Sequence, residues 1–256
     1  RSNKRNIIVA PTGVAAINAG GMTIHSFFQL PLSPFVPNTN IKNRFDYSKE
    51  KRKIMRTLDL LIIDEISMVR ADILDAIDSV LRRFREPDKP FGGVQLLMIG
   101  DLQQLTPVVT PEEEELLRQH YDTPYFFGSK ALRSISYVTI ELTHVYRQQD
   151  ETFITLLNNI REGKVSADDL QRLNERYDPT FQPKEGSDYI RLTTHNRMAE
   201  SYNEDQLRRL PTKAYTFSAE TDGNFPEYNY PTDFNLTLKT GAQVMFIRND
   251  NNGRYY

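Results

Sequence analysis

Leu60-Leu61-Ile62-Ile63-Asp64-Glu65 is the stretch that decides the fold. Its first four residues form a continuous apolar run, which is typical of a parallel strand covered by helices on both faces. Two carboxylates follow at the strand's carboxyl end, where α/β sheets bind their ligands. Two interpretations are open: the pair belongs to a binding site, or it caps a helix that begins after Ser67. Taken alone, the pair favours capping.

Similar apolar runs occur on both sides of this stretch and alternate with segments of helical spacing, which indicates an α/β protein with a parallel sheet. Strands are expected at residues 6–10, 58–63, 94–99, 137–142, 188–193 and 244–247. Helices are expected at residues 14–19, 23–28, 72–84, 153–160, 167–176 and 196–210, with a further one starting at 112–115. The prolines and asparagines of 30–50 predict a surface insertion or small hairpin, and the sequence after Pro211 is β-like.

A second strand end carries polar residues as well. Residues 94–99 run into Gly100-Asp101-Leu102-Gln103-Gln104, where an amide can bond a phosphate and a water without burying another charge. Arg147 lies close to a domain boundary expected near 143–146, from where a guanidinium could reach phosphates across a cleft. The commonplace alternatives are a polar turn and an ordinary surface arginine.

Composition limits the class of protein. The chain has 256 residues, 32 Lys+Arg against 34 Asp+Glu, and a net charge of -2, which suits one large or two modest domains. Its 14 Phe and 13 Tyr exclude wholesale disorder, and the absence of cysteine excludes disulfides, thiolate metal sites and a cysteine nucleophile. No apolar run reaches the ~18 residues of a membrane span, so we expect a soluble, intracellular protein. Near-neutral charge leaves local nucleic-acid binding open.

In combination, these stretches resemble the Pif1 family of superfamily 1B 5′→3′ DNA helicases, which is related to RecD. The resemblance runs in order from residue 6 to about residue 210. Its parts are 10–16 (motif Ia), 21–28 (motif Ib), 64–68 (motif II), 100–105 (motif III), 142–163 (motif IV), 194–196, and the family's signature element at 72–85 and 90–95.

The resemblance implies an α/β fold of the RecA-like P-loop NTPase type with flanking helices and a partial second RecA-like domain. Residues 1–143 would be domain 1A without its first strand and P-loop, with 30–50 as a 1B wedge insertion. Residues 144–256 would be part of domain 2A, with 211–256 leading into an SH3-like 2B insertion. The implied cofactors are ATP and Mg²⁺, and the partners are single-stranded and forked duplex DNA. We expect a monomer in the bacterial cytoplasm, or in the nucleus or mitochondrion if it is eukaryotic.

Site roles also follow from the resemblance. Asp64 would coordinate Mg²⁺, Glu65 would activate water, Gln104 would sense the γ-phosphate, and Arg147 would act as an arginine finger from the second domain. The implied single-stranded DNA contacts are Pro11, Thr12, Gly13, Thr23, His25, Ser26 and Phe27 in the first domain and Thr194, His195 and Asn196 in the second. A structural histidine at His25 and a core aromatic at Phe27 stay open as alternatives.

The chain departs from the family pattern at the P-loop. It has no G-x-x-x-x-G-K-[ST] sequence, because Val165 follows its only Gly-Lys pair and Asn158 stands where the first glycine belongs. The late family motifs are absent too, and the chain starts at Arg1, so we expect a fragment with little or no ATP hydrolysis of its own. Two other functions stay open: a single-stranded DNA-binding module without catalysis, and a P-loop NTPase-like protein with a protein partner.

Overall fold

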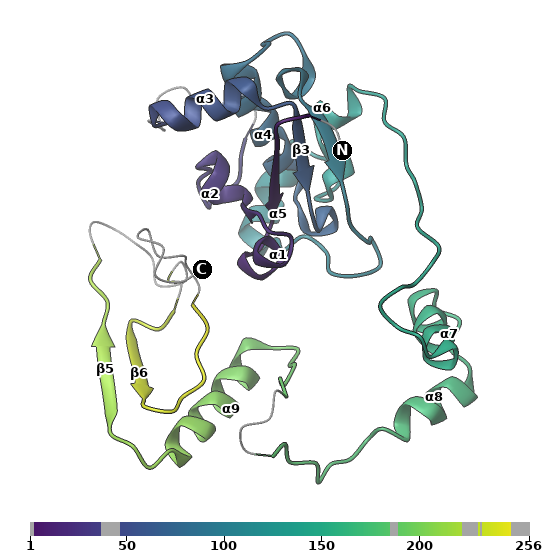
Figure 1. Cartoon of the computed structure of the whole chain (residues 1–256), viewed down its shortest axis with the longest axis vertical. Coiled ribbons are helices and arrows are strands. Elements are labelled where there is room, and N and C mark those ends of the chain that lie inside the picture. The colour runs from purple at the N-terminus through teal and green to yellow at the C-terminus, as the bar shows by residue number, and fades with distance from the viewer. Residues whose placement is uncertain (1–2, 37–46, 185–188, 222–229, 231, 247–256) are drawn as a thin grey trace. The chain divides into compact units, whose positions relative to one another are not determined.

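The computed structural model describes residues 3–36, 47–184, 189–221, 230 and 232–246. The chain divides into two compact units, Arg1–Arg161 and Glu162–Tyr256 (Figure 1). The division falls later than the boundary expected near 143–146, so the helix α7 (Glu151–Arg161) belongs to the first unit. Within the described residues, no helix is both long enough and apolar enough to cross a membrane.

The first unit is built on a four-stranded parallel sheet in the order β2-β1-β3-β4. Its strands are β1 (Asn6–Ala10), β2 (Met22–Thr23), β3 (Leu60–Ile63) and β4 (Gln95–Met98). The strand predictions at 6–10, 58–63 and 94–99 are therefore confirmed. Leu61 and Ile63 are 0% exposed, as expected for a central strand. The carboxyl ends of all four strands lie at the same edge of the sheet. Among the described strands, β4 pairs only with β3.

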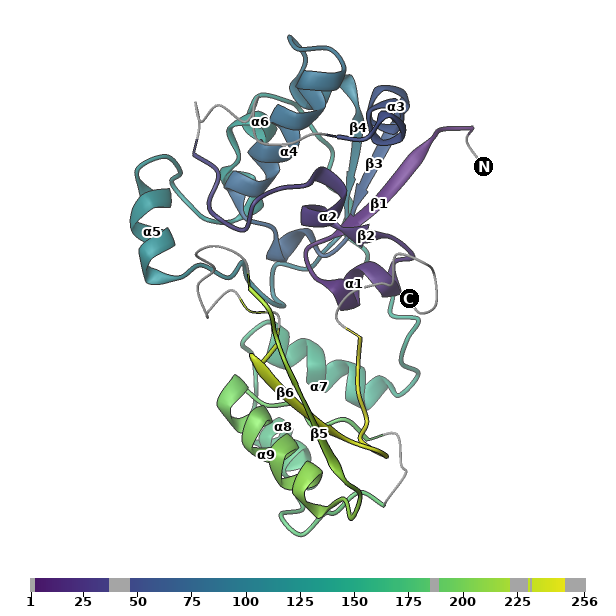
Figure 2. The same cartoon turned by 90° about the vertical axis from the view of Figure 1, so that its left-hand side faces the viewer.

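The first unit also contains helices. They are α1 (Gly13–Asn18), α2 (Ile24–Phe28), α3 (Lys49–Thr57), α4 (Ala71–Phe84), α5 (Pro111–Arg118), α6 (Lys130–Arg133) and α7, with short 3₁₀ turns η2 (Ile66–Met68), η3 (Pro90–Gly93) and η4 (Phe126–Gly128). Figure 2 shows α4 lying alongside the sheet. Leu74, Ile77 and Leu81 of α4 are 0% exposed, which accounts for the helical spacing seen in the sequence.

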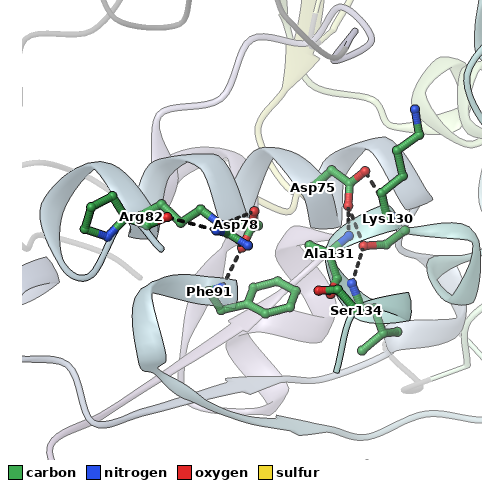
Figure 3. A network of polar contacts seen from close by, with 10 residues as sticks. Asp75, Asp78, Arg82, Phe91, Lys130, Ala131 and Ser134 are labelled. Atoms are coloured by element: carbon green, nitrogen blue, oxygen red, sulfur yellow. Dashed lines mark hydrogen bonds and ion pairs between the residues drawn. The ribbon is translucent and has the colours of Figure 1, made fainter. Parts of the chain in front are cut away.

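Two aspartates of α4 tie neighbouring elements to this helix (Figure 3). Asp75 accepts hydrogen bonds from the Ser129 hydroxyl (2.5 Å), the backbone N–H groups of Lys130 (3.2 Å) and Ala131 (3.0 Å), and the Tyr121 hydroxyl (3.0 Å). Asp78 accepts in a similar way from the guanidinium of Arg82 and the backbone N–H of Phe91 at η3. Because Asp75 is 7% exposed, it fixes the start of α6 from inside the unit.

The described part of the second unit contains two helices and a hairpin. The helices are α8 (Ala167–Asn174) and α9 (Asn196–Arg209), both predicted, and neither has a buried residue. The antiparallel hairpin of β5 (Ala214–Ser218) and β6 (Asn235–Lys239) confirms the β-like character expected after Pro211. The assignments of this region to domain 2A and to a 2B insertion stay predictions.

Three predicted strands are wrong in the described residues. Residues 137–142, 189–193 and 244–246 have no regular structure, while Asp188 and Ile247 lie outside the described residues. Val138, Ile140 and Leu192 are 87%, 79% and 91% exposed. A β-prone sequence becomes a strand only where a partner strand and a packing surface are present, and here these side chains have neither.

The predicted insertion at 30–50 is only partly visible, because 37–46 lie outside the described residues. Residues 30–36 and 47–48 form no strand, and from Lys49 onward the chain is helical. The helix α3 was not expected. The Ser48 hydroxyl caps it by accepting from the N–H of Lys51 (3.2 Å), and Met55 anchors it in the core at 0% exposure.

Candidate nucleotide and DNA site

The carboxylates Asp64 and Glu65 stand at the carboxyl edge of the sheet, directly after β3. The N–H of Asp64 donates to the carbonyl of Val9 (2.9 Å), and the N–H of Ile66 donates to the carbonyl of Ile99 (2.9 Å). The end of β3 is thus tied to β1 on one side and to the segment after β4 on the other. The Asp64 carboxylate accepts from the N–H of Glu65 (3.0 Å).

Glu65 adopts a left-handed backbone conformation, with φ 51° and ψ 45°. This region costs a non-glycine residue about 1 kcal/mol or more, and such outliers gather at functional sites. Glu65 makes no side-chain cap at η2, and the N-cap residue of α4, Arg70, makes none either. The helix-capping interpretation of the acidic pair therefore receives no support from the geometry.

The segment after β4 brings its polar residues to the same edge. Asp101 accepts from the N–H of Gln103 (3.0 Å) and the amide of Gln104 (3.0 Å), and it pairs with the guanidinium of Arg161 at 3.3 Å. Arg161 also donates to the side chain of Gln103. The Gln103 N–H, and then the Gln104 amide and the Arg161 charge, hold the pKa of Asp101 below its usual range. This link between Asp101 and α7 was not predicted from the sequence.

These groups fit Mg²⁺ bound together with a nucleotide. Mg²⁺ prefers oxygen ligands and takes one or two carboxylates, completing its shell with water and phosphate. Among the described residues no group of three or more His, Asp or Glu side chains could hold a metal ion. The buried hydroxyl of Ser67, beside this edge, has no hydrogen-bond partner within the described chain. A ligand or ordered water satisfies groups of this kind.

The predicted DNA contacts of the first unit lie after β1 and β2. These strands pair in parallel, with Ala10 opposite Thr23, so α1 and α2 begin side by side. The hydroxyls of Thr12 and Thr23 cap them, accepting from the N–H groups of Ala15 (3.2 Å) and Ser26 (3.3 Å). Gly21 permits the close approach of the two segments, because a Cβ there would lie 2.3 Å from the carbonyl oxygen of Ile8.

The DNA-contact candidates differ in accessibility. Gly13 and Ser26 are exposed, while Pro11, Thr12 and Thr23 are half-buried. Phe27 is 2% exposed and packs edge-on against Phe28 at 4.8 Å between ring centroids. Its ring has no free face for a base, so the stacking role is wrong in this structure and the core alternative holds.

His25 is half-buried and near a buried ion network. Burial, and then the positive charge of Arg70, lower the pKa of His25, so its ring is neutral at physiological pH. Arg70 itself pairs with Asp72 (2.8 Å) and Glu113 (2.7 Å). A neutral imidazole can hydrogen-bond or stack, but it supplies no charge for a phosphate.

Lys51 of α3 also reaches this region and was missed in the sequence. Its ammonium donates to the Ser26 carbonyl (2.8 Å) and lies 5.6 Å from the ring centroid of Phe27. No signal in the sequence marked it, since it depends on the position of α3.

The remaining predicted residues are distributed over both units. Arg147 is exposed in the first unit, not the second, and forms no hydrogen bond or ion pair within the described residues. Thr194, His195 and Asn196 are exposed in the second unit, where the Thr194 hydroxyl lies 2.9 Å from Nδ1 of His195 and Asn196 begins α9. Their predicted roles remain predictions.

The parallel sheet, its flanking helices and the acidic strand end define a RecA-like α/β domain of the P-loop NTPase class. Residues 1–171 match the family described as PIF1-like helicase, and the chain belongs to that family.

The relatives agree with this assignment. ATP-dependent DNA helicase PIF1 of Homo sapiens is 38% identical over 95% of this chain and 37% of its own length, and ATP-dependent DNA helicase RRM3 of Saccharomyces cerevisiae is 34% identical over 94% and 33%. The chain thus spans about a third of the length of these curated relatives.

Solved structures are similar over the whole chain. Bacteroides Pif1 in complex with ADP-AlF3 and single-stranded DNA is 41% identical with a TM-score of 0.89, over 100% of this chain and 59% of that one. A structure of two coordinating Pif1 helicases at forked duplex DNA is 42% identical with a TM-score of 0.90, over 100% and 60%. Because that assembly holds two helicases, the expected monomer gains no support.

Proposed function

We propose that this chain is part of an ATP- and Mg²⁺-dependent 5′→3′ DNA helicase that moves along single-stranded DNA and unwinds duplex. The observation that carries the proposal is the shared sheet edge. Asp64, Glu65 and the Asp101–Gln104 segment lie at the carboxyl ends of β3 and β4. Thr12, which follows β1, and Thr23, the last residue of β2, lie at the same edge. Because the candidate nucleotide-binding and DNA-binding residues lie at the ends of strands of one rigid sheet, a movement at the nucleotide site can be transmitted to the DNA site.

The chain's own residues divide the chemistry between them. When bound, Mg²⁺ would neutralise phosphate charge and orient the γ-phosphate. Asp64 would hold it through an oxygen, and Glu65 would orient and deprotonate the attacking water. Gln104, steadied by Asp101, would sense the γ-phosphate through its amide. Arg147 would stabilise the charge that develops during transfer.

The DNA contacts would act through the backbone of the strand. The exposed Gly13 and Ser26 leave room for a phosphate beside the N-termini of α1 and α2. Thr194, His195 and Asn196 would hold the same strand from the second unit. If the two sets of contacts bind the DNA strand alternately during ATP turnover, the protein would move along the strand in steps.

The purified chain tests the proposal directly. We expect it to bind a fluorescent oligo-dT strand, with affinity that falls as salt rises, and to show no ATP turnover, because it has no P-loop sequence. Gly13→Glu should weaken the binding by placing a like charge at the phosphate. Gln171→Glu, which adds a negative charge at an exposed position of α8, is the control. Absence of binding at low salt would refute the DNA grip, and measurable turnover would refute the need for a P-loop.

A further inference from the structure

The unexpected helix α3 carries a row of cations on one face. Lys49, Arg52, Lys53 and Arg56 follow the spacing i, i+3, i+4 and i+7, which places them on the same side of a helix. We call these four residues the α3 stripe. All four are exposed, whereas Met55 on the opposite face is 0% exposed. Over seven residues the row extends about 10 Å.

Three of the four cations of the α3 stripe have no ion-pair partner among the described residues. Glu50 is the acidic residue of α3; it lies three positions before Lys53, beside the row, and the structure shows no ion pair between the two. Within the described part of the chain, Lys49, Lys53 and Arg56 form no ion pair. Like charges four residues apart, as at 49 and 53 or at 52 and 56, destabilise a helix. A helix face that only contacts solvent gains from mixed charges, so this row has an electrostatic cost that an anionic ligand would remove.

The end of α4 extends the positive surface. Arg85 donates from its guanidinium to the carbonyl of Arg56 (2.9 Å), at the last turn of α3. Arg83 is exposed and lies over the ring of Phe84, which packs against Tyr47 just before α3. Arg83 of α4 and Arg85, which follows that helix, thus lie near the two ends of α3. The chain as a whole carries a net charge of -2, so this concentration is local.

We propose that the α3 stripe binds the sugar–phosphate backbone of duplex DNA. The inference rests on the proposed function, and it adds a second DNA surface to the single-strand site. A row of cations that neutralises phosphates releases condensed counterions, which is the main source of sequence-independent affinity for duplex. Lys51 of the same helix contacts Ser26, so the stripe lies about one helix diameter from the predicted single-strand contacts.

Duplex fits the stripe better than a single strand does. Single-strand sites combine basic residues with exposed aromatic rings on which bases stack. Helix α3 has no aromatic residue, and the neighbouring Tyr47 is 2% exposed. A straight, rigid row suits phosphates that a duplex already holds in place, and contacts of this type position DNA without reading its bases.

The test uses the whole chain and three probes: oligo-dT, a blunt duplex and a forked duplex, each measured by fluorescence anisotropy across a salt series. The variant is Lys49→Gln/Lys53→Gln/Arg56→Gln, because Gln has nearly the helix propensity of Lys and Arg and keeps α3 folded. The matched control removes three exposed cations elsewhere: Arg118→Gln/Lys130→Gln/Arg133→Gln on α5 and α6. Thermal unfolding confirms that each variant is folded.

Three lost phosphate contacts should lower the salt slope for both duplex probes by about 2.7, since each contributes about 0.9. Between about 50 and 200 mM salt, the wild type should therefore lose about 40-fold more duplex affinity than the variant. Oligo-dT binding should stay within about twofold, and the control should behave as the wild type does.

The remaining outcomes separate the inference from the proposed function. Unchanged duplex affinity and slope in the variant would overturn the inference, and so would an equal loss on oligo-dT, which would make the stripe a single-strand contact. If the wild type binds oligo-dT but no duplex, the proposed single-strand grip stands and the inference fails. If it binds duplex through the stripe but no oligo-dT, the inference stands and the single-strand grip fails. Binding to none of the probes refutes both.

Discussion

Replacing Asp75 with asparagine tests how strongly one buried carboxylate holds the first unit together. One oxygen of Asp75 accepts from the Ser129 hydroxyl and the Ala131 N–H, and the other accepts from the Tyr121 hydroxyl and the Lys130 N–H. In Asp75→Asn an NH₂ group replaces one oxygen. A hydroxyl facing it can turn and accept, but a backbone N–H cannot, so either amide orientation leaves one backbone donor without an acceptor.

The expected loss follows from these contacts. A buried unsatisfied donor costs about 1–3 kcal/mol, and the remaining bonds lose the added strength of a charged acceptor. Relief from burying a charge offsets part of this, which leaves about 2–3 kcal/mol. For a unit of this size each kcal/mol lowers the midpoint by about 2–4 °C, so the midpoint should fall by about 4–12 °C.

Circular dichroism is the suitable assay, because the chain has no tryptophan. Asp88→Asn, the same change at an exposed position, should stay within about 0.5 kcal/mol of the wild type. Tyr121→Phe removes one donor and leaves the carboxylate with three, so it should cost about 1 kcal/mol. If Asp75→Asn has the same thermal midpoint as the wild type, Asp75 does not fix α6 and the reasoning is refuted.

Four further predictions follow from the sheet and its edge. Gly21→Ala should cost at least about 1–3 kcal/mol because its Cβ would lie 2.3 Å from a carbonyl oxygen, whereas Gly13→Ala, with open space around it, should be tolerated; equal urea midpoints would contradict this. Burial raises the pKa of Tyr47 to about 12, so the unfolded chain ionises first and stability should fall as pH rises above about 10, more steeply than in Tyr47→Phe; parallel urea-midpoint profiles of the two would refute it. Ile140→Lys should reduce concentration-dependent association, measured by light scattering, because Ile140 is 79% exposed in a β-prone segment; equal scattering by the variant and the wild type would show that this segment does not drive association. In a longer form of the protein that includes a P-loop, Glu65→Gln should bind ATP but turn it over very slowly, and normal single-turnover rates would reject Glu65 as the base.

Three of the four strands of the sheet were predictable because they consist mainly of apolar residues, whereas the two-residue strand β2 was not predicted. A run such as Ile7-Ile8-Val9 fits only a strand buried on both faces, and its order in the chain then sets a parallel sheet. Residues 137–142 are also rich in β-prone residues, but a strand also needs a partner, and composition carries no information about partners. Helix α3 was missed because Met55 is its one fully buried residue and Leu58, also buried, lies just after it. Its sequence therefore shows no regular spacing of apolar residues.

The site was predictable to a similar extent. Carboxylates and amides at strand ends meet at one edge through topology alone, which is why Asp64 and Asp101 could be placed. Phe27 could not be assigned, because an aromatic residue beside polar ones has the same pattern in a core and in a stacking site. The pair of Arg161 with Asp101 joins residues 60 positions apart and depends on where α7 packs, which no local pattern encodes.

The left-handed backbone of Glu65 has a consequence for attempts to make this protein more robust. Glycine adopts that conformation without the strain that a side chain brings, so Glu65→Gly should fold at least as well as the natural sequence. A library of variants selected only for heat resistance would therefore enrich glycine at residue 65 and discard the carboxylate proposed to activate water. Directed evolution of this domain needs a selection for turnover alongside the selection for stability, because at this residue the two favour different amino acids.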